Sequence, residues 1–198
     1  MKKLLTLVIA VIIGTSMTFA QGIESEIQAG INLSSISKYD SKTGFNVGFR
    51  GTIPLQSADG TYFNIGALLT LKGAEKDYGY ELDAKINAYY LEIPIHFGYR
   101  HAVSESATLF GEFGPYLGIG LFGKAKVSSM GDSAKVDTFS DEGGAKRFDF
   151  GLGFRAGIEI NQKIPISVGY DFGLLNINKD EDPSLKSSNF TVAIGYKF

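Results

Sequence analysis

The 198-residue chain has no cysteine and only two histidines, and these shortages exclude several kinds of chemistry. Without cysteine there is no disulfide framework, no thiolate metal site and no cysteine nucleophile. Two histidines also argue against a histidine-rich metal centre. The formal net charge is −2 at pH 7, so no basic excess points to nucleic acid. We therefore expect one domain of ordinary size with no metal, no cofactor and no nucleic acid partner.

An apolar run of signal-peptide length lies at the N-terminus. The run, Leu4–Ile13, follows a basic start and is too short for a comfortable transmembrane helix. Small residues then occupy the −3 and −1 positions of a cleavage site that ends at Ala20. The sequence predicts a Sec signal peptide over residues 1–20, cleaved before Gln21, and a mature domain over residues 21–198. Because no cysteine follows the cleavage site, we expect no lipid anchor.

Glycine and aromatic residues are abundant, with 25 Gly, 15 Phe and 10 Tyr, and they follow a period of two. In RFDFGLGFRAGIEI, residues 147–160, alternate residues are apolar, and from Asp149 onward those between them are only glycines and charged residues. This alternation predicts a β-strand with two unlike faces. Seven further stretches alternate in a similar way, at residues 25–34, 43–53, 62–71, 88–100, 107–122, 164–174 and 188–198. Strands of about ten residues are long enough to cross a bilayer at a tilt.

The connections between these stretches alternate in length. They are short after the second, fourth and sixth stretches and longer after the others, with residues 123–146 the longest. Short periplasmic turns and long extracellular loops are typical of outer membrane barrels. The sequence therefore predicts an all-β protein: an eight-stranded antiparallel up-and-down transmembrane β-barrel in the outer membrane of a Gram-negative cell. We expect a multi-pass monomer whose two termini are periplasmic.

The same alternation could describe a soluble barrel or sandwich with its apolar face inside. Packing argues against that alternative, because a glycine-rich solvent face and a lining of bulky Phe and Ile are both wrongly sized. In a membrane barrel, the outward positions diverge and carry large side chains into lipid. The inward positions converge, so glycines make room for Arg, Glu and Tyr. An interior of eight strands is just wide enough for side chains, which predicts a plugged barrel.

Several inward positions carry charge at similar distances from the periplasmic strand ends. They are Arg50, Glu92, Glu112, Arg155 and Asp171. Ionisable groups at membrane depth face the interior and pair, so we expect these five to converge on the barrel axis. Further hydrogen bonds could come from Tyr90, His96 and Tyr116. We favour a structural plug that fixes strand register over a proton or ion path, because buried polar networks must be complete.

Catalysis has no support in the sequence. An outer membrane protease or acyltransferase needs His, Asp or Ser at the extracellular rim, whereas His96 and His101 fall near the periplasmic end. We therefore expect no enzyme. Pro94 and Pro115 are departures from the strand pattern, since each removes a ladder donor inside a closed barrel. A β-bulge at either position would accommodate it.

Four stretches carry a family resemblance: YYLEIPIHFGYR, GEFGPYLGIGL, RFDFGLGFRAGIEI and the final GYKF. They resemble the outer membrane β-barrel family of Bacteroidetes type that includes PorT-like porin family proteins. The end of the chain, Tyr196 with Phe198, is similar to the signal read by the barrel-assembly machinery, which the resemblance implies as a partner during insertion. The resemblance implies location and fold, and one branch of the family is tied to export of secreted proteins.

Three functions from different classes remain open. The first is a structural or surface-interaction protein whose long loops meet extracellular partners. The second is an accessory of a protein-secretion system, with other membrane proteins as partners. The third is a narrow ion or small-solute pore, which a plugged interior disfavours.

Overall fold

The computed structural model describes residues 22–37, 39–56, 58–77, 82–129, 132–140, 144–179 and 184–198. Within them the regular structure is β throughout. The strands are β1 (Glu24–Ile36), β2 (Asp40–Pro54), β3 (Thr61–Asp77), β4 (Leu82–Ser104), β5 (Ala107–Ser129), β6 (Asp132–Asp137), β7 (Phe148–Ile160), β8 (Ile164–Gly173) and β9 (Ser187–Lys197). No helix in these ranges is long and apolar enough to cross a membrane.

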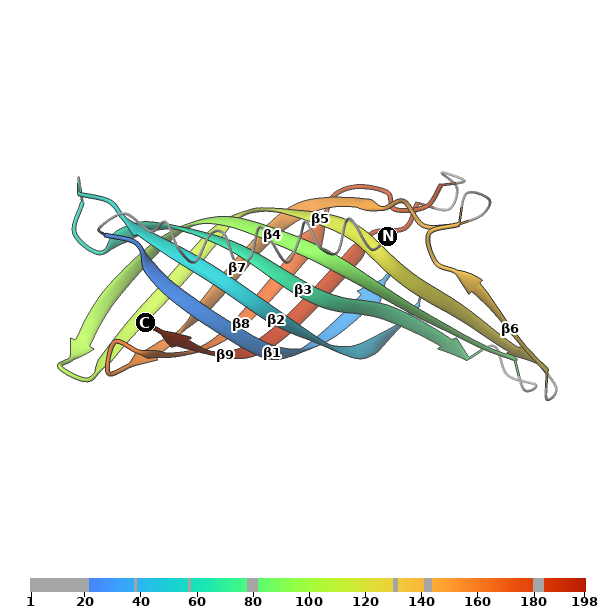
Figure 1. The fold of residues 1–198 in the computed structure, drawn as a ribbon, viewed down its shortest axis with the longest axis horizontal. Coiled ribbons are helices and arrows are strands. Elements are labelled where there is room, and N and C mark those ends of the chain that lie inside the picture. The colour runs from blue at the N-terminus through green and yellow to red at the C-terminus, as the bar shows by residue number, and fades with distance from the viewer. Residues whose placement is uncertain are drawn as a thin grey trace.

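All these strands except β6 close into a barrel (Figure 1). Each strand pairs antiparallel with its neighbours in the order β1-β2-β3-β4-β5-β7-β8-β9, and β1 pairs with β9 to complete the circle. Among the described strands, the short strand β6 pairs with the outer part of β5 alone. The predicted eight-stranded antiparallel up-and-down barrel is therefore confirmed.

The two ends of the barrel differ. The connections at residues 55–60, 105–106 and 161–163 are short and lie at the end that also holds the C-terminus, which we call the short-turn end. At the opposite, long-loop end, β4 and β5 are each 23 residues long and extend beyond the other strands together with β6 (Figure 1).

The prediction of a long loop at residues 123–146 is wrong in part. The strand β5 continues to Ser129, and β6 returns beside it with Lys124 opposite Asp137. The segment has no bulky apolar face, because its lysines alternate only with small or β-branched residues. It therefore lacks the lipid-facing pattern by which the other strands were recognised, although period-two alternation continues through it.

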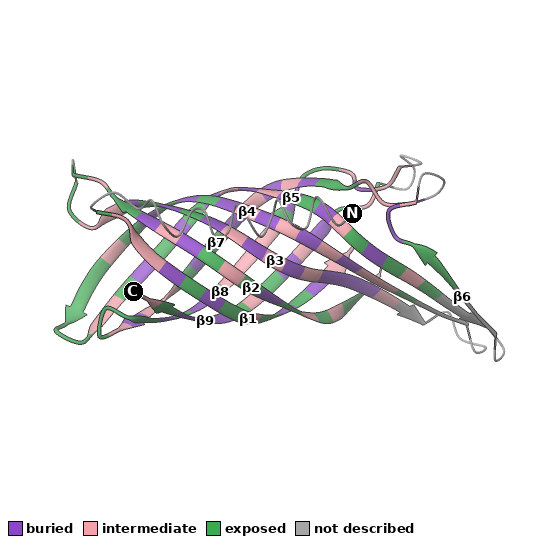
Figure 2. Cartoon of the chain, in the orientation of Figure 1, coloured by how far each residue is buried: buried purple, intermediate pink, exposed green. Residues whose placement is uncertain are grey.

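The two faces of each strand differ as predicted (Figure 2). Outward side chains are apolar and exposed, as in Phe113, which is 58% exposed. Inward neighbours are buried, as in Tyr116, which is 1% exposed. Most of the largest fully buried side chains are polar, including Glu26 and Asp149. This inversion of a soluble core excludes the soluble barrel, because water would then cover a belt of Phe, Ile and Leu.

The two prolines interrupt hydrogen-bonded pairing without shifting the register. In the β4–β5 ladder, Pro94 is paired with Tyr116 and Phe97 with Phe113. The two positions between these pairs are unpaired, and the pairing then resumes in the same register. The suggested bulge at Pro94 or Pro115 is therefore wrong. In this ladder the register shifts instead at two other places: beside Tyr89, where β5 carries one extra residue, and between Ala102 and Ser104, where β4 carries one. A closed ladder tolerates the missing donors because pairing on both sides of the gap holds the strands in place.

Inward glycines lie where large side chains cross the lumen. A Cβ at Gly157 would lie 2.7 Å from the Phe110 ring, and a Cβ at Gly120 would lie 2.4 Å from the Phe139 ring. Neither contact distance is sterically allowed. The glycine-rich face therefore leaves room for bulky side chains, here from a neighbouring strand and from the connection after β6, as the sequence predicts.

Candidate functional site

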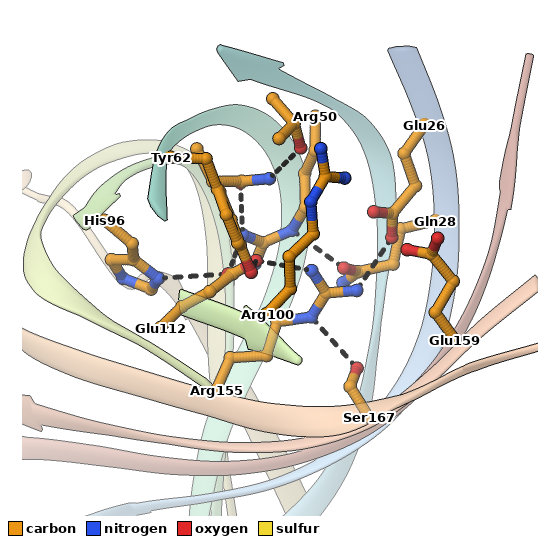
Figure 3. A network of polar contacts seen from close by, with 12 residues as sticks. Glu26, Gln28, Arg50, Tyr62, His96, Arg100, Glu112, Arg155, Glu159 and Ser167 are labelled. Atoms are coloured by element: carbon orange, nitrogen blue, oxygen red, sulfur yellow. Dashed lines mark hydrogen bonds and ion pairs between the residues drawn. The ribbon is translucent and has the colours of Figure 1, made fainter. Parts of the chain in front are cut away.

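The first polar cluster in the barrel interior is built around two arginines, and we call it the arginine cluster: Glu26, Arg50, Glu112 and Arg155. The register places Glu112 on β5 directly opposite Arg155 on β7. The Arg155 guanidinium lies 2.7 Å from the Glu26 carboxylate and 3.3 Å from that of Glu112. The Arg50 guanidinium lies 3.6 Å from the other Glu112 oxygen. Two cations thus face two carboxylates across the lumen (Figure 3).

Neutral side chains complete the hydrogen bonding of the arginine cluster. Arg50 donates to Gln28 at 2.8 Å and to Asn64 at 3.0 Å. Arg155 donates to Ser167 at 3.0 Å, and Tyr62 donates to Glu112 at 3.1 Å. The charges are therefore both paired and hydrogen-bonded, which a buried polar network requires if it is to stabilise the fold.

A second cluster lies nearer the long-loop end, and we call it the lysine cluster: Lys72, Glu92, Tyr116 and Asp149. The Lys72 ammonium lies 2.7 Å from Glu92 and 3.5 Å from Asp149. It also lies over the Tyr116 ring, 4.7 Å from its centroid. Ser187 donates to Asp149 at 2.7 Å, and Tyr116 donates to the same oxygen at 3.2 Å. One cation here faces two carboxylates and an aromatic ring.

The structure brings only some of the predicted interior residues together. Arg50, Glu112 and Arg155 meet as expected, and His96 Nδ1 lies 3.6 Å from Glu112. Glu92 belongs instead to the lysine cluster, as does Tyr116, and the Tyr90 ring lies 5.5 Å from the Lys72 ammonium.

Asp171 is also separate from the arginine cluster. It accepts a hydrogen bond from Asn189 at 3.3 Å and forms no ion pair with the charged groups that the structure describes. The expected convergence is therefore found only in part: Arg50, Glu92, Arg155 and Asp171 line one small internal space, but no ion pair among the described residues joins Glu92 or Asp171 to the arginines. The prediction estimated the height of each residue by counting positions from the strand ends, which ignores the stagger between tilted strands. On the neighbouring strands β4 and β5, that stagger sets Glu112 beside Gly98 and Glu92 beside Gly118.

Sequence reasoning missed three members of the two clusters, Glu26, Lys72 and Asp149, and also Tyr62, which donates to Glu112. Glu26 and Tyr62 lie inside the predicted stretches 25–34 and 62–71, at inward positions of the period-two pattern, and Lys72 lies one step beyond the second stretch. Asp149 was placed on the inward face but assigned no partner. Assigning a partner to every inward charged residue and tyrosine, and extending the pattern one step past residue 71, would have found all four.

The short-turn end carries a partly exposed ion-pair network. Arg100 donates two hydrogen bonds to Glu24, at 2.7 and 2.8 Å. Lys197 reaches Glu24 at 3.0 Å and also pairs with Glu159. These groups join β1, β4, β7 and β9 where the first and last strands meet.

The predicted assembly signal and cleavage site lie at the ends of the chain. Tyr196 is 48% exposed and Phe198 is 69% exposed, so neither packs into the lumen. Their role in assembly stays a prediction. The predicted cleavage site at Ala20 and Gln21 lies outside the described residues.

A cavity of about 790 Å³ lies at the long-loop end. Its floor is formed by Lys72, Tyr90 and Ser187. Beside it, the connection after β6 folds into the barrel mouth, where the buried Phe139 ring meets Tyr90 edge-on at 5.6 Å. The Arg147 guanidinium lies over Phe139 at 4.9 Å. The cavity is thus a cup, closed below by the lysine cluster, with the size of a small-molecule site.

Comparison with known proteins identifies the family. A family model described as outer membrane protein beta-barrel domain matches residues 9–179. The chain belongs to this family. It is therefore an outer membrane protein, and its apolar outer face lies against lipid. No curated protein matches the chain. The PorT-like specificity, the non-enzymatic role and the monomeric state stay predictions.

Several solved outer membrane proteins are similar to this family member. The attachment invasion locus protein Ail of Yersinia pestis is 21% identical, with a TM-score of 0.45, over 90% of this chain and 100% of that chain. Neisserial surface protein A is 15% identical, with a TM-score of 0.49, over 91% and 100% of the two chains. OprG from Pseudomonas aeruginosa is 15% identical, with a TM-score of 0.44, over 89% and 96%.

Among the described residues, no group of three or more His, Asp or Glu side chains is arranged to hold a metal ion. The arginine cluster and the lysine cluster consist of groups whose charges pair with one another. The cup at the long-loop end has instead a mostly apolar lining and an opening. Of the features described, the cup is the one whose shape suits binding of another molecule.

Proposed function

We propose that this outer membrane protein is a non-conducting barrel that binds a partner or ligand at its long-loop end, which faces the outside of the cell. The observation that carries the proposal is the floor of the cup. There the lumen ends on Lys72, ion-paired to Glu92, rather than continuing as a channel. The secretion-accessory hypothesis shares this orientation and differs in its partner, which would be another membrane protein.

The interior below the cup supports a blocked pathway. The space lined by both Glu92 and Arg155 has a volume of about 30 Å³, room for only about one or two water molecules. An ion would have to displace first Lys72 and then the paired arginines. A buried charge left without its partner costs about 3–5 kcal/mol of stability, so the displacement of charges in either cluster opposes the passage of an ion.

Conductance tests the blocked interior. Purified barrels inserted in a planar bilayer in concentrated KCl should carry no steady current above that of the bare bilayer, because both clusters close the lumen. A channel-forming porin inserted under the same conditions is the control for insertion. Reproducible unitary currents from the wild-type barrel would establish the pore function in place of the proposed one.

Orientation can be tested because the chain has no cysteine, so single cysteines can be labelled selectively. Lys126→Cys lies at the long-loop end and Glu105→Cys in the turn between β4 and β5, and both positions are exposed. A membrane-impermeant maleimide should label Lys126→Cys on intact cells and Glu105→Cys only after the outer membrane is permeabilised. The opposite pattern would place the cup on the periplasmic side and contradict the proposal.

A further inference from the structure

We infer that the cup at the long-loop end binds an uncharged amphipathic small molecule, with its apolar part against the cup walls and a hydroxyl or amide donor toward the floor. This inference deepens the proposed function and rests on it, because it names the ligand class of the outward-facing end. The ligand chemistry follows from the walls, the charges and the hydroxyl groups of the cup.

The walls are apolar and come from two sides. Ile86 and Ala125 line the cup from β4 and β5, whereas Ile177 and Leu185 line it from the connection between β8 and β9. Backbone bonds hold the wall residues of that connection in place: Lys146 donates to Ile177 at 2.7 Å, and Ile177 donates to Leu185 at 2.9 Å. The apolar surface is thus present before a ligand arrives, which lowers the entropic cost of binding.

The charges of the cup favour an uncharged ligand. Its charged lining residues, within the described ranges, are Lys72 and Asp137. The Lys72 ammonium is already paired with Glu92 and lies near Asp149, so an anionic group placed on it would also meet two carboxylates. A cationic group at the floor would meet Lys72 itself. Asp137 does not change this, because it is exposed and already accepts a hydrogen bond from the Phe139 N–H at 2.8 Å. A charged group at the floor would therefore lose its water without gaining a complementary partner there.

Two hydroxyl groups of the lining favour a ligand that donates. Ser187 donates its proton to Asp149 at 2.7 Å, and Thr138 donates its proton to the Asn87 carbonyl at 3.1 Å. Each oxygen keeps a lone pair with which it can accept. A ligand with hydroxyl or amide N–H groups therefore matches the floor and rim better than an ether or a hydrocarbon.

Methyl NMR of the full barrel in lipid nanodiscs can test this inference. The probes share one octyl chain and differ in headgroup: octyl glucoside, octyl sulfate and octylammonium, each kept below the concentration that dissolves the disc. Octyl glucoside should shift the methyl signals of Ile86, Ile177 and Leu185 in a saturable manner. The two charged probes should bind at least about 10-fold more weakly, the ratio that corresponds to about 1.4 kcal/mol.

Two variants separate binding in the cup from partitioning into lipid. Ala125→Phe places a ring in the cup opposite Ile86, where the apolar part of the ligand is expected, and should abolish the saturable shifts, whereas Lys126→Phe, at the exposed neighbouring position, should keep them. Methyls of the lipid-facing Ile166 report whether each variant is folded and how much probe enters the bilayer.

Three outcomes would each overturn the inference: saturable shifts that persist in Ala125→Phe, no saturable shifts in the wild type, or a charged probe that binds as tightly as octyl glucoside. The proposed function is tested separately by conductance. If the wild-type barrel carries no current, a negative NMR result overturns only the ligand inference. If it carries unitary currents, the proposed function is contradicted whatever the NMR result.

Discussion

Replacing Arg155 with methionine should lower the free energy of unfolding by about 3–5 kcal/mol, the usual cost of removing one partner from a buried ion pair. Arg155 contacts Glu26 at 2.7 Å and Glu112 at 3.3 Å. Methionine retains much of the aliphatic volume, so the loss is mainly electrostatic. After the change, Glu112 still has Arg50 at 3.6 Å, but Glu26 loses its ion pair within the cluster. Guanidinium-induced unfolding in lipid vesicles measures the change.

Two further variants define what the Arg155 result means. Adding Glu26→Gln to Arg155→Met should recover part of the lost stability, because the uncompensated carboxylate is removed. Lys126→Met, which removes an exposed cation, should change stability by less than about 0.5 kcal/mol. In planar bilayers Arg155→Met should remain silent, since the lysine cluster still closes the lumen. A variant with unchanged stability and steady conductance would instead make Arg155 a gate, and the structural-plug interpretation would be wrong.

The division into an inward and an outward face was predictable from the sequence alone. The apolar residues of the period-two pattern are exposed, as in Phe113, or half-buried, as in Leu117, whereas neighbours such as Glu112 are buried. The prediction succeeded because the lipid-facing side of a strand accommodates large apolar side chains, whereas the narrow lumen limits side-chain size. These two environments alternate along every strand. The same pattern also located Arg50 and Arg155 inside the barrel.

Partners across the lumen were not predictable in the same way. They depend on the stagger between tilted strands, which no single strand encodes. That stagger separates Glu92 from the arginine cluster and gives it Lys72 as a partner. The cup was missed for a second reason. Its walls include Ile177 and Ala145, which lie in connections where period-two alternation carries no information.

A second large loss of folding stability is expected when Lys72, which faces two carboxylates of the lysine cluster, is replaced. Lys72→Ala leaves Glu92 and Asp149 buried without a cation, and stability should again fall by about 3–5 kcal/mol. The same guanidinium-induced unfolding in vesicles measures it. The double variant Lys72→Ala with Glu92→Gln should be more stable than Lys72→Ala alone, because it halves the number of uncompensated carboxylates. If Lys72→Ala were as stable as the wild type, the lysine cluster would not hold the barrel together.

Lys72→Ala also permits a chemical rescue, because the space left by the side chain lies at the floor of an open cup. The removed ammonium lay near two carboxylates and over the Tyr116 ring, 4.7 Å from its centroid. A small alkylammonium can enter from the cup and make the same contacts. Butylammonium should therefore raise the unfolding midpoint of Lys72→Ala and leave that of the wild type unchanged, whereas butanol should do neither. Equal effects of the two compounds would show that the restored contact is apolar, and that the charge of Lys72 is not what stabilises this end of the barrel.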